Sequence, residues 1–200
     1  MGEIVGAAAI WFRPLIGLCA FAGLRLGEAA AVQLDDIDFL RRTLTISRQV
    51  QRKRGGGIEF RAPKYCSERV VFVPDGLVTM LAGHVEHIGV RPDGWLFAGA
   101  GPGPPHKNTV FYWWRKTLND AGLSGITMHD LRHSYASGLI AQGCDVVTVQ
   151  RSLGHSMATT TLDTYSHRWP TAEDRTRKAA DAMMNTALGN SADSVRTEAT

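Results

Sequence analysis

The chain has 200 residues, 44% hydrophobic and 20% charged, a composition typical of a globular protein that excludes disorder over most of its length. Its three cysteines, Cys19, Cys66 and Cys144, are odd in number and form no C-x-x-C pair, which argues against a disulfide framework or a zinc site and favours the reducing cytoplasm. The net charge is only +3, but nine basic and two acidic residues lie between Arg41 and Arg69, and this local charge of +7 indicates a surface that faces phosphate groups.

The apolar opening, IVGAAAIWFRPLIGLCAFAGL, is as long as a short membrane span. Arg13 and Pro14 lie at its middle and no basic segment precedes it, so both a membrane span and a secretion signal are disfavoured. We therefore expect a buried helix over residues 3–22, broken or kinked near Pro14, and a short helix over residues 23–32.

Between residues 43 and 73 the hydrophobic pattern changes to a period of two. The segments TLTISRQV, GIEFRA and ERVVFV alternate, and RKRGGG and PKYCS separate them. This pattern predicts a small antiparallel sheet with two turns. Because basic charge is concentrated in this segment, it is either a surface that faces phosphate groups or a solvated hairpin that merely happens to be basic.

Helical spacing returns after the sheet. We expect helices over residues 75–89, 109–121, 130–142, 145–153, 159–165 and 171–188, with Gly122, Gly143 and Gly154 as C-caps. GAGPGPPHKN predicts a loop, and the last dozen residues a frayed end. The predicted fold class is mostly α (α+β): a helical domain with a small antiparallel β-sheet near residues 43–73.

Six side chains form a chemically coherent set, although each alone has an ordinary structural explanation. Guanidinium groups bind two phosphate oxygens at once, and a lysine can protonate a leaving oxygen. A tyrosine that attacks a phosphate forms a phosphodiester, which conserves the bond energy needed to rejoin the strand. With no carboxylate cluster for a metal, the set suits a negatively charged, five-coordinate phosphorus. The six are Arg25, His129, Arg132, His155, Tyr165 and one lysine.

The motifs GLRLGE, HDLRHSYAS, LGHS and TLDTYSH, in this order, resemble the tyrosine recombinase family, which comprises the phage integrases and related site-specific recombinases. The resemblance implies an enzyme that cleaves and rejoins double-stranded DNA through a 3′-phosphotyrosyl intermediate, without metal or other cofactor. It implies that Arg25 and Arg132 bind the scissile phosphate, and that Tyr165 attacks it. It also implies that His129 supports acid-base transfer and that His155 hydrogen-bonds the phosphate or the nucleophile.

Other positions follow from the same resemblance. Lys64, in APKYCSERVVFVP, matches the lysine that protonates the leaving 5′ oxygen, with Lys53 and Lys107 as alternatives. Glu28 matches an acid that orients the first arginine. His133 and His167 match positions without a catalytic role. The basic segment adds predicted DNA-binding residues, namely Arg41, Arg42, Arg48, Arg52, Lys53 and Arg54.

The expected organisation is a catalytic domain over residues 1–170, followed over residues 171–200 by a C-terminal helix and a frayed tail. The helix either docks on a neighbouring copy to form a homo-oligomer on DNA or packs on its own domain. Family members usually begin with a separate core-binding domain. Because 24 residues precede Arg25, we expect that domain to be absent, and DNA binding to be weak and strongly salt-dependent.

Two other functions compete with the recombinase hypothesis. One is a catalytically silent DNA-binding remnant or accessory protein of a mobile element, and the other is an unrelated helical regulator with a basic hairpin. The intact set of six residues favours retained chemistry, because a drifting remnant is expected to lose a member.

Overall fold

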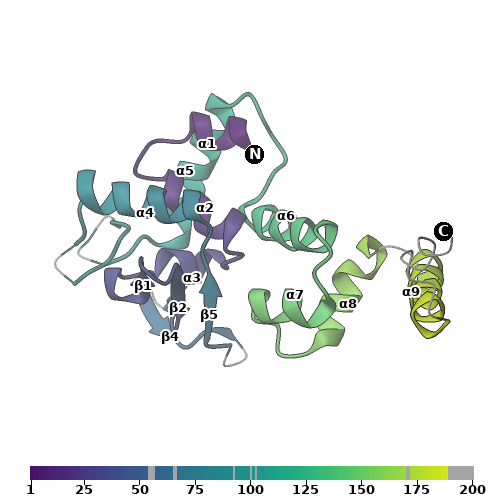
Figure 1. Ribbon diagram of the computed structural model, residues 1–200. Coiled ribbons are helices and arrows are strands. Elements are labelled where there is room, and N and C mark those ends of the chain that lie inside the picture. The colour runs from purple at the N-terminus through teal and green to yellow at the C-terminus, as the bar shows by residue number, and fades with distance from the viewer. Residues whose placement is uncertain are drawn as a thin grey trace, which may run out of the picture.

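The computed structural model describes residues 1–53, 57–64, 67–91, 93–99, 101, 103–169 and 172–188. Arg54, one of the predicted DNA-binding residues, lies outside these ranges, as does Cys66. The predicted fold class is confirmed, since the described chain is mostly helical with small antiparallel sheets (Figure 1). Within these ranges no helix combines the length and apolarity needed to cross a membrane.

The N-terminal helices build the centre of the main core. The predicted break is confirmed, but it comes before Pro14: α1 (Gly2–Ala7) and α2 (Arg13–Phe21) are separate, and Pro14 lies in the first turn of α2. That position suits proline, because the amide at the start of a helix has no intrahelical partner. The short α3 (Leu26–Ala30) follows after Gly23, whose φ is +67°.

The predicted single sheet is in fact two. Strands β1 (Ile37–Asp38), β2 (Thr43–Ile46) and β5 (Arg69–Phe72) form an antiparallel sheet in the order β1-β2-β5, while β3 (Gln49–Arg52) pairs with β4 (Ile58–Arg61).

The alternation in TLTISRQV changes phase where the two sheets separate. Leu44 and Ile46 are buried, and so is Gln49, an odd number of positions further on. A single continuous strand cannot turn these three side chains to one face. Gln49 instead donates from Nε2 to the Ala62 carbonyl, which ties the second sheet together.

The remaining helices begin and end within two residues of the predicted bounds. They are α4 (Asp75–His87), α5 (Lys107–Asp120), α6 (Met128–Ala141), α7 (Val146–Leu153), α8 (Ala158–Tyr165) and α9 (Ala172–Ala187), and short 3-10 turns cover Leu34–Asp36 and Ser166–Arg168. Thr127 and Asp130 cap α6 reciprocally, and the Asp145 carboxylate caps α7. Gly122, Gly143 and Gly154 all have positive φ, as the C-cap prediction requires.

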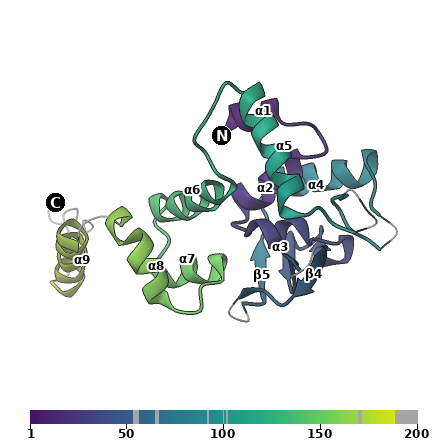
Figure 2. The ribbon, with the colours of Figure 1, turned by 180° about the vertical axis from the view of Figure 1, so that it is seen from behind.

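The buried side chains form two clusters of unequal size. The larger surrounds α2 and joins the helices α1 to α5 to the β1-β2-β5 sheet. The smaller lies among α6, α7 and α8, and Figure 2 shows these three helices as a separate group beside the rest. Its buried members are Ala136, Ile140, Val149, Leu153 and Tyr165.

Candidate active site

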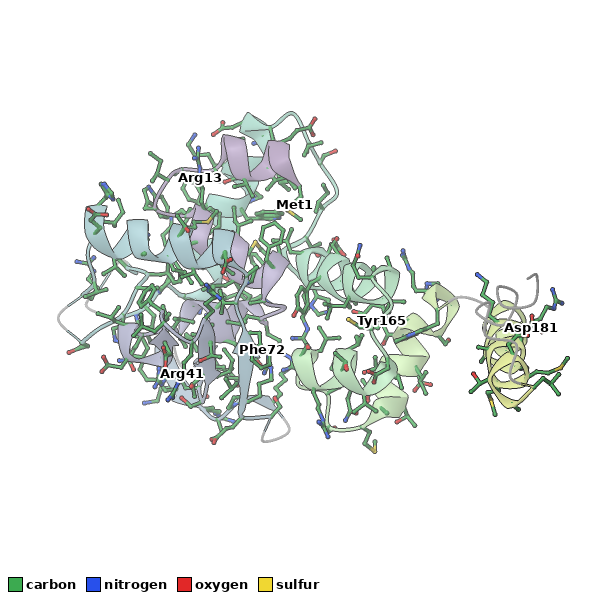
Figure 3. The ribbon with its side chains drawn as sticks, viewed as in Figure 1. Met1, Arg13, Arg41, Phe72, Tyr165 and Asp181 are labelled. Atoms are coloured by element: carbon green, nitrogen blue, oxygen red, sulfur yellow. The ribbon has the colours of Figure 1, made fainter. Side chains whose placement is uncertain are left out.

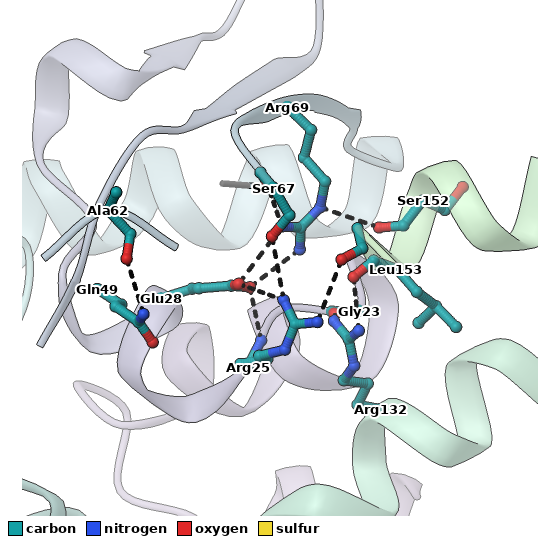
Figure 4. Close-up of polar contacts among 11 residues, drawn as sticks. Gly23, Arg25, Glu28, Gln49, Ala62, Ser67, Arg69, Arg132, Ser152 and Leu153 are labelled. Atoms are coloured by element: carbon teal, nitrogen blue, oxygen red, sulfur yellow. Dashed lines mark hydrogen bonds and ion pairs between the residues drawn. The ribbon is translucent and has the colours of Figure 1, made fainter. Parts of the chain in front are cut away.

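Arg25 is the N-cap of α3, where extended backbone aims its side chain away from the helix. Its Nη1 donates to Glu28 Oε1 at 2.7 Å and lies 3.5 Å from Ser67 Oγ. Its Nη2 donates to the Gly154 carbonyl at 3.2 Å. The side chain therefore links α3 to the connection before β5 and to the end of α7 (Figure 4).

Glu28, the predicted orienting acid, holds two arginines. It is fully buried, and its other arginine partner, Arg69 on β5, donates from Nη2 to Oε2 at 2.9 Å. Burial acts to raise the pKa of Glu28, but the hydrogen bond from Arg69 and the charges of Arg69 and Arg25 outweigh it and hold that pKa below its ordinary value. Glu28 is therefore an anion that fixes both guanidinium groups.

Sequence reasoning did not single out Arg69 as a site residue. Besides Glu28, its side chain contacts the Ser152 carbonyl at 3.2 Å. It lies in APKYCSERVVFVP, the segment that contains Lys64, but its partner on α3 is 41 residues distant in the sequence. No local sequence pattern predicts the ion pair between Glu28 and Arg69.

Arg132 lies one turn into α6 and is almost completely buried, with 2% of its surface exposed. Its Nη1 donates to the Gly23 carbonyl, and its Nη2 donates to the Leu153 carbonyl at 2.5 Å. Burial, followed by the charge of Arg25, lowers the pKa of Arg132 to about 9, which still leaves it protonated at neutral pH.

Three arginines therefore meet at the C-terminal end of α7. Arg69, Arg132 and Arg25 contact the consecutive carbonyls of residues 152, 153 and 154 (Figure 4). The last carbonyls of a helix lack intrahelical partners and carry negative partial charge, so they attract cations. The same concentration of positive charge suits a phosphate.

His155 follows directly after this junction. Its Nδ1 lies 2.9 Å from the hydroxyl of the buried Thr161 on α8, which fixes the ring. Burial lowers the pKa of His155 to about 4, and the three arginines act in the same direction. The imidazole is therefore neutral at physiological pH, and its residue directly follows the carbonyls that the arginines contact.

Tyr165 is the last residue of α8 and belongs to the smaller core, with 4% of its surface exposed. Its hydroxyl lies 2.5 Å from Nδ1 of His133 on α6. The His133 ring packs edge-on against His129, one turn earlier, with 4.4 Å between the ring centroids. His133, expected to have no catalytic role, is thus in direct contact with the predicted nucleophile.

A groove of about 820 Å³ opens beside this junction. Arg25, Lys64 and His129 line it together with basic side chains of β3 and of the start of α5, Arg52 and Lys107. Among the described residues that line it there is no carboxylate. Arg132, His155 and Tyr165 are not part of this lining and lie towards α7 and α8.

The predicted DNA-binding residues separate into three groups. Arg52 lines the groove, and Lys53 is exposed next to it. Arg41 and Arg42 are exposed near the β1-β2 connection, where Arg42 pairs with Asp75 at 2.7 Å; Figure 3 shows Arg41 far from Tyr165. Arg48 points inward, pairs with Asp36 at 2.6 Å and lies over the Trp95 ring.

Within the described ranges, no three side chains of the metal-ligating types form a group that could hold an ion. Cys19 is fully buried in the main core, and this burial raises the pKa of its thiol to about 12. That thiol is therefore protonated and packs as an apolar side chain.

Known proteins resemble this chain along most of its length. The model of the phage integrase family matches residues 3–171. The ICEBs1 integrase of Bacillus subtilis is 26% identical over 183 residues, which cover 86% of this chain and 49% of that protein. A tyrosine recombinase of Thermosipho africanus is 30% identical over 150 residues, which cover 74% and 47%. The chain spans about half the length of these curated relatives.

Solved structures show the same fold. The Tn1549 transposon integrase in complex with transposon right end DNA aligns with a TM-score of 0.70 at 23% identity, over 87% of this chain and 59% of that one. The XerA recombinase aligns with a TM-score of 0.66 at 20% identity, over 84% of this chain and 62% of that one.

Proposed function

Because this chain belongs to the phage integrase family, we propose that it carries the catalytic machinery of a site-specific DNA recombinase that cleaves and rejoins DNA through Tyr165. The observation that carries the proposal is the meeting of Arg25, Arg132 and His155 at the end of α7. These side chains come from distant parts of the sequence and gather beside a groove whose described lining residues include no carboxylate. The ICEBs1 integrase and another relative, transposase A from transposon Tn554 of Staphylococcus aureus, support a place in a mobile element. We place the proposed action on DNA in the cytoplasm.

In the proposed cleavage step, the Tyr165 oxygen bonds to the phosphorus as the bond from phosphorus to the 5′ oxygen breaks. Arg25 and Arg132 stabilise the additional negative charge of the five-coordinate phosphorus, and the neutral His155 donates a hydrogen bond to one of its oxygens. Lys64, exposed at the groove, gives a proton to the leaving 5′ oxygen. The product is a 3′-phosphotyrosyl strand, and rejoining reverses each step.

The groove is the proposed DNA path. Arg25, Arg52, Lys64 and Lys107 line it, and each phosphate neutralised by such a cation releases counterions. The DNA in the Tn1549 complex supports DNA as the partner.

A covalent adduct tests the proposed activity. The protein is incubated with a nicked duplex whose cleaved end diffuses away, and the products are separated on a denaturing gel. We expect a protein-DNA band that Tyr165→Phe abolishes and that the matched variant Tyr112→Phe, in an exposed tyrosine of α5, retains. Duplex binding without any adduct would instead identify a silent DNA-binding protein.

We also propose that α9 joins copies of the protein on DNA. Every side chain described from residue 176 to residue 188 is exposed, and its apolar members recur at helical spacing: Ala180, Met183, Met184, Ala187 and Leu188. An unburied apolar stripe is suited to a groove on another protein copy.

Paired substitutions on α9 test this assembly. Met184→Asp places a charge on the apolar stripe, and Asn185→Asp places the same charge at the next position, off the stripe. Only Met184→Asp is expected to reduce the assembly on DNA measured by sedimentation velocity. Equal effects of the two variants would contradict docking through the stripe.

A further inference from the structure

The contact between His133 and Tyr165 has no place in the mechanism given above. We propose that His133 is a catalytic residue that accepts the phenol proton of Tyr165 during cleavage and returns it during rejoining. This inference rests on the proposed function, because it concerns the same nucleophile.

Geometry supports a direct proton transfer. His133 Nδ1 lies 2.5 Å from the Tyr165 hydroxyl, and among the described side chains it is the hydrogen-bond partner of that oxygen. With the imidazole protonated at Nε2, Nδ1 presents its lone pair to the phenol, and the O–H donates to it. In this conformation the base is already in contact with the phenol.

The surroundings of Tyr165 make a base necessary. Burial raises the pKa of its phenol, while the charges of Arg132 and Arg168 act in the opposite direction. A phenol with a raised pKa is rarely ionised at neutral pH, so attack requires removal of its proton as the new bond forms.

Adjacent residues of α6 have different roles in this proposal: Arg132 binds the phosphate, and His133 contacts the nucleophile. Arg132 points towards the end of α7 and the Gly23 carbonyl, whereas His133 points towards α8. His129 packs against His133 and also lines the groove. The two imidazoles thus extend from the groove to the buried phenol.

The proton balance of the step is complete. As the Tyr165 oxygen bonds to phosphorus, its proton moves to His133 Nδ1, and the 5′ oxygen leaves with a proton from Lys64. In rejoining, the 5′ hydroxyl returns its proton to Lys64 as its oxygen bonds to phosphorus, the Tyr165 oxygen leaves, and His133 returns the phenol proton to it. No oxidant, metal or additional reactant takes part.

Substitutions of His133 test whether its side chain is needed for adduct formation. Asn places a polar group where Nδ1 lies, whereas Ala removes the contact. We expect His133→Ala and His133→Asn both to slow adduct formation by about 100-fold or more, because neither side chain can accept the phenol proton. His87→Ala, in an exposed histidine of α4, serves as the unaffected control.

A substrate that does not use the tyrosine isolates the chemical step. DNA ending in a 3′-(p-nitrophenyl phosphate) can be joined to a 5′-hydroxyl strand with departure of nitrophenolate, which needs no proton. We expect His133→Ala to join this substrate at nearly the wild-type rate, also when combined with Tyr165→Phe. An equal loss on both substrates would overturn the proposal, since it would place the defect in phosphate binding or folding.

Two further results would also overturn the inference. Faster cleavage by His133→Ala would make the contact a restraint on Tyr165, and an unchanged rate would make it irrelevant to the chemistry. The contact itself is checked without DNA: the ¹³Cζ resonance of Tyr165, assigned with Tyr165→Phe, is expected to shift in His133→Ala. If the wild-type protein forms no adduct although this shift is seen, the proposed function fails while the contact stands.

Discussion

At the residue scale, the site depends on one buried carboxylate. Glu28 is fixed by Arg25 and Arg69, and the two arginines in turn hold the end of α7. Removing one partner of a buried ion pair leaves the other charge without compensation, which costs more than the pair itself contributes.

We therefore expect Glu28→Gln to lower the free energy of unfolding at pH 7 by about 3 kcal/mol. Because the folded-state pKa of Glu28 lies below its ordinary value of 4.5, its stabilisation is present above that pH and is lost as the pH falls below it. The difference between wild type and variant, measured by urea unfolding, should shrink below about pH 4.5.

Glu59→Gln is the matched control for that measurement. Glu59 pairs with the exposed Arg61 at 2.8 Å on the sheet surface, where an ion pair contributes less than about 1 kcal/mol. Equal losses from Glu28→Gln and Glu59→Gln would show that the arginines do not depend on Glu28.

Sequence reasoning predicted several of the residues that gather here and missed others. Arg25, Arg132, His155 and Tyr165 stand in ordered motifs, so their types and spacing are visible in the chain. Arg69 and the His133 contact depend on which side chains folding brings together. The hydroxyl of Tyr165 reaches His133 across 32 residues of sequence, and nothing in HDLRHSYAS indicates that contact.

At the element scale, the end of α7 is the point where the two halves of the site join. Gly154 ends the helix in the left-handed conformation, with φ of +63°, and its carbonyl accepts from Arg25. A β-carbon added there would lie 2.7 Å from Nη1 of Arg69. A glycine is therefore favoured at this position for two reasons: the backbone has a positive φ, and a β-carbon would collide with Arg69.

Two glycine substitutions separate these requirements. Gly122→Ala, at a φ of +67° with open space around it, is expected to cost about 1 kcal/mol of stability through backbone strain alone. Gly154→Ala should cost more and should also slow adduct formation, because it displaces Arg69. Chemical denaturation measures the first effect and the denaturing gel the second; identical behaviour of the two variants would contradict a steric role for Arg69.

Elements were predicted well where hydrophobic periodicity is long and less well where it is short. Helices from α4 onwards agree with the predicted bounds to within two residues, because caps and glycines mark their ends. The separation into two sheets was missed, since a change of phase within TLTISRQV looks like an ordinary strand until Gln49 is seen to be buried.

At the scale of the whole molecule, the exposed basic side chains of the predicted DNA-binding segment lie in two regions, the groove and the surface near the start of α4. The predicted basic segment reaches the groove through Arg52 and Lys64, while Arg41 and Arg42 lie near the start of α4 and Arg48 turns inward. A count of charges along the sequence cannot separate these groups, because they follow one another closely in a single basic segment.

Salt dependence of DNA affinity distinguishes the two regions. Arg52→Gln and Lys107→Gln should each reduce the slope of log K against log salt by about 1, as expected for one lost phosphate contact. Arg41→Gln serves as the comparison and should leave the slope unchanged. A similar reduction from Arg41→Gln would extend the DNA path to the β1-β2 connection.

The two hydrophobic clusters should also differ in local stability. The cluster of α6, α7 and α8 has five buried members, far fewer than the main core around α2. Small clusters open at lower free energy. Hydrogen exchange followed by mass spectrometry should therefore show faster exchange in α7 and α8 than in α2, and the reverse order would contradict this division.

Tyr165, the proposed nucleophile, is part of the smaller hydrophobic cluster, so its motions are coupled to those of the cluster. Tyr165 packs with Ala136, Ile140, Val149 and Leu153, so any repositioning of its oxygen towards a phosphate disturbs those neighbours. Substitutions that make the cluster more rigid, such as a larger side chain at Ala136 that fits its surroundings, should raise thermal stability and slow strand cleavage together. Adaptation of this protein to heat would then be constrained by these five core residues, through the familiar trade-off between stability and turnover.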